Sequence, residues 1–136
     1  MVIAAIILLS IQLIKFNNIA TNRYMVNAID KYIACEVKEK VEDYEKTTGK
    51  KVKNIAFYNL EKAKKYYPGL DDGFNISART EKMSSFYLIK YYLNKPLNLT
   101  DGNNSIFKEY FENKKWTNFD LDQIIIKDDT IHIFVY

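Results

Sequence analysis

The sequence predicts an α+β fold: an N-terminal transmembrane helix, a long amphipathic helix, and a small sheet of three to four strands, mixed or antiparallel, that ends in a β-hairpin and is covered by two further helices. Three observations support this class. Residues 2–14 (VIAAIILLSIQLI) carry no charge. Apolar residues between positions 26 and 44 recur every three or four residues, the period of a helix with one buried face. The last fourteen residues place two apolar runs on either side of a two-residue turn, as a hairpin does.

The apolar run is the first element, and Lys15 ends it. A bilayer-spanning helix needs about 20 mostly apolar residues, whereas residues 1–14 form only about 21 Å of helix. Three further apolar residues, with Lys15 reaching back to the interface, complete a transmembrane helix over residues 1–20. Continuation upstream in a longer chain would lengthen it. One alternative is a buried helix of a water-soluble domain. The other is a cleaved signal peptide, but the sequence has neither the basic residue that usually precedes its apolar core nor a small-residue cleavage site after it.

Positive charge is concentrated beside the apolar run. The net charge is +3, and residues 15–53 hold nine Lys/Arg against six Asp/Glu, whereas residues 54–136 hold eleven of each. Lys15 and Arg23 are the candidate membrane-proximal residues, because basic side chains there can contact anionic headgroups. They favour a cytoplasmic tail, but whole domains translocate largely regardless of such charge. The sequence lacks the dense basic stripe that nucleic-acid binding needs, so we expect no nucleic-acid partner.

The remaining elements follow in order. Gly49 predicts the end of the long helix. Residues 52–60 predict a strand inside the sheet, because apolar side chains fall on both of its faces. Residues 82–93 and 105–115 predict two helices, each with large apolar residues three and four apart. Two strands joined at Asp128-Asp129 close the chain.

Candidates for catalysis or metal binding are few. The chain has one cysteine, Cys35, and one histidine, His132, so nucleophilic triads and zinc sites lack a complete set of residues. Glycine-rich phosphate loops and the common hydrolase motifs are absent from the sequence. Cys35 is predicted as a small core residue and His132 as a cross-strand or surface residue. Asp71 and Asp72 are predicted to form a turn rather than a metal site. We expect no catalytic residue, no metal site and no cofactor in this chain.

Three aromatic residues are the candidate binding residues. Tyr66 and Tyr67 precede a Pro-Gly turn, and Trp116 follows two lysines. Aromatic side chains with a polar tip suit a platform for a sugar or a lipid headgroup. Packing in the core or at its rim is the alternative for all three.

Several short stretches together resemble a known family. They are Tyr44-Glu45, residues 48–52 (TGKKV), Ile55-Ala56, residues 67–69 (YPG), Tyr91-Tyr92, Tyr110-Phe111, Lys115-Trp116, Phe119-Asp120, Gln123, residues 129–132 (DTIH) and Val135-Tyr136. In this order they resemble the C-terminal extracytoplasmic region of polytopic glucosyltransferase-type membrane proteins, a class of glycosyltransferase of low-GC Gram-positive bacteria. The resemblance covers most of residues 25–136.

The resemblance implies a location, a parent protein and partners. In that family many transmembrane helices use a lipid-linked sugar, and a small extracytoplasmic domain follows the last helix. Residues 1–20 would then be the last transmembrane helix of a larger protein, and residues 21–136 an extracytoplasmic α+β domain at the cell membrane. The family's catalytic acids belong to upstream membrane loops, so none is assigned to this chain. The implied partners are the bilayer, the upstream transmembrane region and cell-envelope glycan.

Two other function classes stay open. A pilin-like structural protein shares the layout of an apolar helix, an amphipathic continuation and a sheet. Pilins resemble one another in a Glu near the start of the apolar helix, and residues 2–14 contain no acid. A membrane-tethered binding or sensor domain is the other class. The function expected first is a non-catalytic extracytoplasmic domain of a membrane glycosyltransferase that modifies cell-envelope polysaccharide.

Overall fold

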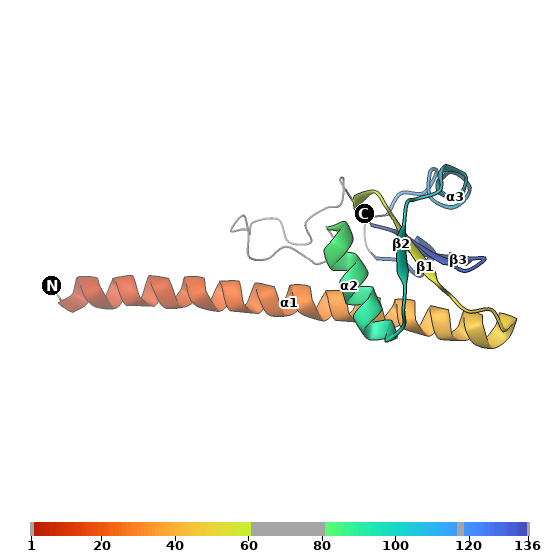
Figure 1. Cartoon of the computed structure of the whole chain (residues 1–136). Coiled ribbons are helices and arrows are strands. Elements are labelled where there is room, and N and C mark those ends of the chain that lie inside the picture. Colours follow the sequence, from red (N-terminus) through yellow and green to blue (C-terminus); the bar gives the residue numbers. More distant parts are fainter. Residues whose placement is uncertain (1, 61–80, 117–118, 136) are drawn as a thin grey trace.

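The computed structural model describes residues 2–60, 81–116 and 119–135. The elements are, in chain order, α1 (Val2–Thr48), β1 (Asn54–Tyr58), α2 (Lys82–Leu93), β2 (Asn98–Thr100), α3 (Asn104–Tyr110), the short 3-10 helix η3 (Leu121–Gln123), β3 (Ile124–Lys127) and β4 (Thr130–Phe134). They combine one long helix with a small mixed four-stranded sheet (Figure 1). The predicted α+β class is therefore confirmed.

The helix α1 is continuous over 47 residues, which corresponds to roughly 70 Å. It joins the apolar segment and the amphipathic segment without a break. Its N-terminal half extends away from the sheet, and its C-terminal half passes beside it (Figure 1). Ile33, Val37 and Val41 are buried in that second half. The helix ends as predicted, because Gly49 adopts a φ of 69° and its N–H donates to the Glu45 carbonyl at 2.9 Å.

The predicted transmembrane helix is not supported. Among residues 2–60, 81–116 and 119–135, no helix contains a segment of the length and apolarity that a bilayer crossing requires. The physical reason is the polar sequence after the apolar run, where Asn17, Asn18 and Arg23 follow Lys15. The uncharged part, residues 2–14, is about 20 Å of helix, and the hydrocarbon core of a bilayer is about 30 Å thick. The described part of the predicted transmembrane segment is therefore helical but contains no such span.

The sheet has the strand order β2-β1-β4-β3. The central strand β1 is parallel to both neighbours, with Ile55 paired to Ile131 of β4, while β3 and β4 form an antiparallel hairpin. The hairpin is confirmed at its predicted turn, where Asp128 has a φ of 58°, a conformation that Asp tolerates. The predicted burial of β1 on both faces is also confirmed, since Ile55 through Tyr58 are buried.

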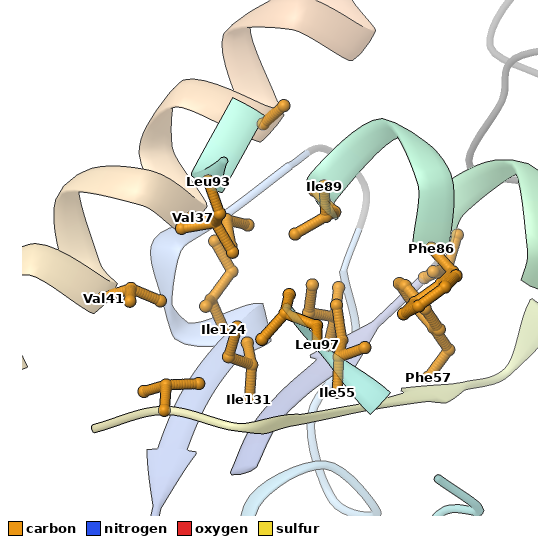
Figure 2. Close-up of a cluster of buried hydrophobic side chains, with 14 residues drawn as sticks. Val37, Val41, Ile55, Phe57, Phe86, Ile89, Leu93, Leu97, Ile124 and Ile131 are labelled. Carbon is orange, nitrogen blue, oxygen red and sulfur yellow. The ribbon is translucent and has the colours of Figure 1, made fainter. Parts of the chain in front are cut away.

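Helices cover both faces of the sheet. α1 and α2 pack on one face, where Val37, Ile55, Ile89, Leu93 and Ile131 belong to a single apolar cluster (Figure 2). On the other face, Ile106 of α3 joins a second cluster that contains Ala56, Tyr58 and Phe111. The α2 helix matches its predicted bounds.

The helix α3 ends earlier than predicted, at Tyr110 rather than near residue 115. The next residue, Phe111, is only 1% exposed. The chain turns there, and the Lys114 N–H donates to the Phe111 carbonyl. Burial of Phe111 against the sheet therefore overrides the helical pattern that continued in the sequence.

Candidate functional site

An uncovered apolar surface occupies the first part of α1. We call residues 3–16 the apolar arm. Its large side chains are 47% to 76% exposed, and they are Ile3, Ile6, Ile7, Leu8, Leu9, Ile11, Leu13, Ile14 and Phe16. Successive residues of a helix lie about 100° apart, so the four residues Ile6–Leu9 alone point to every side. A helix that is apolar all round is normally buried all round, so the arm requires a covering from outside the described residues.

The candidate membrane-proximal residues lie at the base of the apolar arm. Lys15 and Arg23 are both exposed on α1. Val26, which is 5% exposed, is the first buried residue after them. Lys15 therefore lies at the end of the arm itself, and Arg23 lies between the arm and the part of α1 that packs on the sheet. Their contact with headgroups stays a prediction.

The candidate binding residue Trp116 lies in an aromatic cluster. Its ring centroid is 4.6 Å from that of Phe134 and 6.0 Å from that of Phe111. The Lys114 ammonium lies 5.9 Å from the Trp116 ring centroid. The half-buried indole thus packs at the rim of the core. Tyr66 and Tyr67 lie outside the described residues, as do the turns predicted near them.

A buried polar network joins β1 to β4. The Tyr58 hydroxyl lies 2.9 Å from Nδ1 of His132 and accepts a hydrogen bond from the Asn103 N–H at 2.9 Å. Burial lowers the pKa of His132, the Lys127 charge lowers it further, and Asp128 opposes both. Burial raises the pKa of Tyr58, with the Asn103 backbone opposing it. These pKa shifts keep both side chains neutral near pH 7, so the network is suited to holding strands together.

A second polar centre fixes the end of α1. The Glu45 carboxylate, whose side chain is 8% exposed, accepts hydrogen bonds from Lys95 at 2.6 Å and from Lys51 at 3.2 Å. It also accepts one from the Val52 N–H at 3.0 Å. Burial alone would raise the pKa of Glu45, but these three donors outweigh it and lower the pKa to about 2. Glu45 is therefore ionised at neutral pH and ties α1 to the residues that precede β1 and β2.

One cavity in the interior of the described residues is small. A cavity of about 20 Å³ lies between α2 and the ends of β1 and β4, lined mainly by apolar side chains such as Phe57, Ile89 and Ile133. That is about enough for one water molecule. Gln123 also lines it, and its Nε2 has no hydrogen-bond partner among the described residues. Within the same residues, no group of three or more His, Cys, Asp or Glu is placed to hold a metal ion.

The sequence reasoning did not identify these two polar centres. Tyr58 and His132 are 74 residues apart, and Glu45 and Lys95 are 50 apart, so no local pattern marks either contact. Comparisons of the chain with protein-family models, with curated proteins and with solved structures found no match.

Proposed function

We propose that this chain is a non-catalytic extracytoplasmic C-terminal domain of a multi-pass membrane glycosyltransferase or glucosyltransferase that modifies cell-envelope polysaccharide. In this proposal the apolar arm is buried among hydrophobic helices of the membrane-embedded body. The sheet domain then lies on the extracytoplasmic face of the cell membrane. Its partners are the bilayer, the upstream transmembrane region and cell-envelope glycan.

The observation that carries the proposal is the exposure of the apolar arm on all sides. Burying one large aliphatic side chain contributes about 1.5–3 kcal/mol, so leaving Ile6, Leu9 and Leu13 in water forgoes several such contributions. The arm alone is shorter than a bilayer, which is why we infer neighbouring apolar helices as its covering. Because α1 is one continuous helix, it would hold the sheet domain at a fixed distance from that covering.

The glycosyl part of the proposal rests on the resemblance of residues 25–136 to the membrane glucosyltransferase-type proteins. The non-catalytic role rests on the same resemblance, because the family's catalytic acids belong to upstream membrane loops. It also fits the neutral His132, which is bonded to Tyr58 rather than placed at an open site. The purified chain is therefore expected to give no turnover with a polyprenyl-linked glucose. Turnover by the chain alone would contradict the proposal.

The burial of the arm is tested by substituting four of its exposed residues with Gln, namely Ile7, Leu8, Ile11 and Ile14. A matched control substitutes four exposed apolar residues elsewhere, namely Tyr24, Met25, Met83 and Leu121. We expect the unmodified chain and the control to need detergent and to sediment with membranes. The arm variant should remain monomeric in buffer. An unmodified chain that is monomeric without detergent would contradict the proposal.

The parent protein is tested by reading the DNA upstream of Met1. An open frame that encodes further hydrophobic helices is expected. A stop codon followed by a ribosome-binding site would contradict the multi-pass parent.

One observation favours a second candidate, a pilin-like structural protein. The half of α1 that carries the apolar arm extends from the sheet domain while the other half packs on it (Figure 1). Such an arm can also be covered by the arms of other copies. Electron microscopy of the detergent-free chain distinguishes the two candidates: filaments favour the structural protein, and their absence favours the appended domain.

A further inference from the structure

The solvent side of α2 carries large side chains where a surface helix normally carries charges. Met83, Tyr87 and Tyr91 are 50%, 59% and 78% exposed. They are spaced four residues apart, so they line one face of the helix. The opposite face, with Phe86, Ile89 and Leu93, is the one buried against the sheet. We call the exposed stripe the α2 tyrosine face. Packing among the described residues does not account for these exposed side chains.

An open hollow adjoins the α2 tyrosine face. Its volume is about 850 Å³, and it is lined by Tyr87, Lys90, Tyr91, Asn94, Lys95 and Pro96. The lining contains two cations and no acid. One cation is shared, because Lys95 pairs with Glu45. The Lys90 ammonium lies 5.3 Å from the Phe86 ring centroid. The hollow therefore combines two exposed rings, amide and ammonium donors, and an excess of positive charge.

These side chains favour one chemical class of ligand. The rings of Tyr87 and Tyr91 offer flat apolar faces with hydroxyl tips, which suit the C–H faces of sugar rings. Asn94 and the lysines supply hydrogen-bond donors for hydroxyl and acidic groups. A membrane surface is a poorer fit. Val37 of α1 shares the buried cluster with Leu93 of α2 (Figure 2). It lies 21 residues, or about 32 Å, along α1 from Phe16, the end of the arm.

We propose that the α2 tyrosine face and its hollow bind an acidic glycan. The argument against a lipid ligand rests on the proposed function, since it takes the apolar arm to point into the membrane-embedded body. The side-chain chemistry does not depend on that function. The α2 tyrosine face would bind a negatively charged polysaccharide at some distance from the bilayer.

The test uses the full chain in detergent micelles and isothermal titration with polygalacturonate oligomers. Two comparison ligands are titrated separately, namely neutral dextran of the same length and polyglutamate. We expect polygalacturonate to bind and Tyr91→Ala to weaken binding by about tenfold, as loss of an aromatic anchor does. Lys90→Gln should weaken binding of polygalacturonate but not of dextran. The matched control is Tyr24→Ala, which removes a tyrosine that is 73% exposed on α1 and should leave binding unchanged.

Three results would overturn the inference. The first is no binding of either polysaccharide. The second is equal binding of polyglutamate with no effect of Tyr91→Ala, which would show charge attraction alone. The third is that the arm variant binds anionic vesicles and that adding Tyr91→Ala abolishes this binding, which would show a lipid site. Repeating the titration on the arm variant in buffer separates the two proposals, because glycan binding there is expected even if the membrane role of the arm fails.

Discussion

The Tyr58 hydroxyl lies 2.9 Å from Nδ1 of His132, across the two parallel central strands of the sheet. The same hydroxyl is 3.5 Å from the Asn103 carbonyl and accepts from the Asn103 N–H. Which of Tyr58 and His132 donates depends on the tautomer of the imidazole. The hydrogen bond from the Asn103 N–H joins the end of β1 to the segment before α3, so one phenol connects three parts of the fold.

Removing the hydroxyl tests this connection. Tyr58→Phe keeps the ring but leaves the His132 nitrogen and the Asn103 N–H without a partner. We expect a loss of about 1–2 kcal/mol in the free energy of unfolding, measured by urea denaturation. The control is Tyr87→Phe on the exposed side of α2, which should change stability by less than about 0.5 kcal/mol. Equal effects of the two substitutions would contradict the role of the network.

The burial of His132 predicts loss of stability in mild acid. Burial, together with the Lys127 charge, lowers the pKa of His132 in the folded state. An unfolded His has a pKa of about 6.5, so the stabilisation is complete above that pH and is lost as the pH falls through the lower folded value. The urea midpoint should drop as the pH falls below about 6.5. His132→Gln should flatten this drop, and an unchanged slope in the variant would refute the assignment.

Glu45 predicts a second, more acidic transition. Its folded pKa of about 2 lies below its ordinary value of 4.5, so its stabilisation is complete above about pH 4.5 and is lost as the pH falls towards 2. Glu45→Gln should cost about 2 kcal/mol at pH 7, because hydrogen bonds to a charged group are lost. It should also reduce the loss of stability below about pH 4.5, where Asp101, Glu109 and Asp122, whose pKa values are lowered too, still contribute. Glu42→Gln serves as the control, since the Lys38–Glu42 pair is exposed and should contribute less than about 0.5 kcal/mol.

Gly102 predicts a steric effect on Tyr58. A Cβ atom at Gly102 would lie 2.7 Å from Cε1 of the Tyr58 ring, so Gly102→Ala must displace the ring or the backbone. The expected cost is about 1–3 kcal/mol, read from thermal unfolding. In a Tyr58→Leu background the cost should shrink, because the ring it meets is gone. A double-mutant cycle measures this coupling, and additive effects would contradict the predicted clash.

The sequence predicted the structural features that depend on the backbone preference of a single residue. Gly49 ends α1 because its backbone adopts the left-handed conformation. Asp128 adopts the same conformation in the hairpin turn between β3 and β4. Strand β2 was missed, because its three residues become a strand only by pairing with β1, as Ile55 does with Leu99.

Lys40 illustrates the same limit. Glu36 lies one turn away on the same helix, but the Lys40 ammonium donates to the Leu121 and Ile124 carbonyls. Burial lowers the pKa of Lys40, while the charges of Asp122, Asp120 and Glu36 oppose the shift. Residue spacing in the sequence cannot predict partners more than 80 residues away.

The transmembrane prediction failed for a different reason. The apolar run was recognised, but the polar residues after Lys15 were given too little weight.

The central claim is that the apolar arm is shielded from water at the extracytoplasmic face. The most direct measurement is labelling of intact cells with a membrane-impermeant maleimide, using single cysteines in a Cys35→Ala background. Leu9→Cys places the thiol in the arm, and Glu42→Cys places it on the exposed side of the packed half of α1. The account predicts rapid labelling of the Glu42→Cys variant and no labelling of the Leu9→Cys variant until the membrane is dissolved. Labelling of both variants at the same rate, or of neither in intact cells, would contradict it.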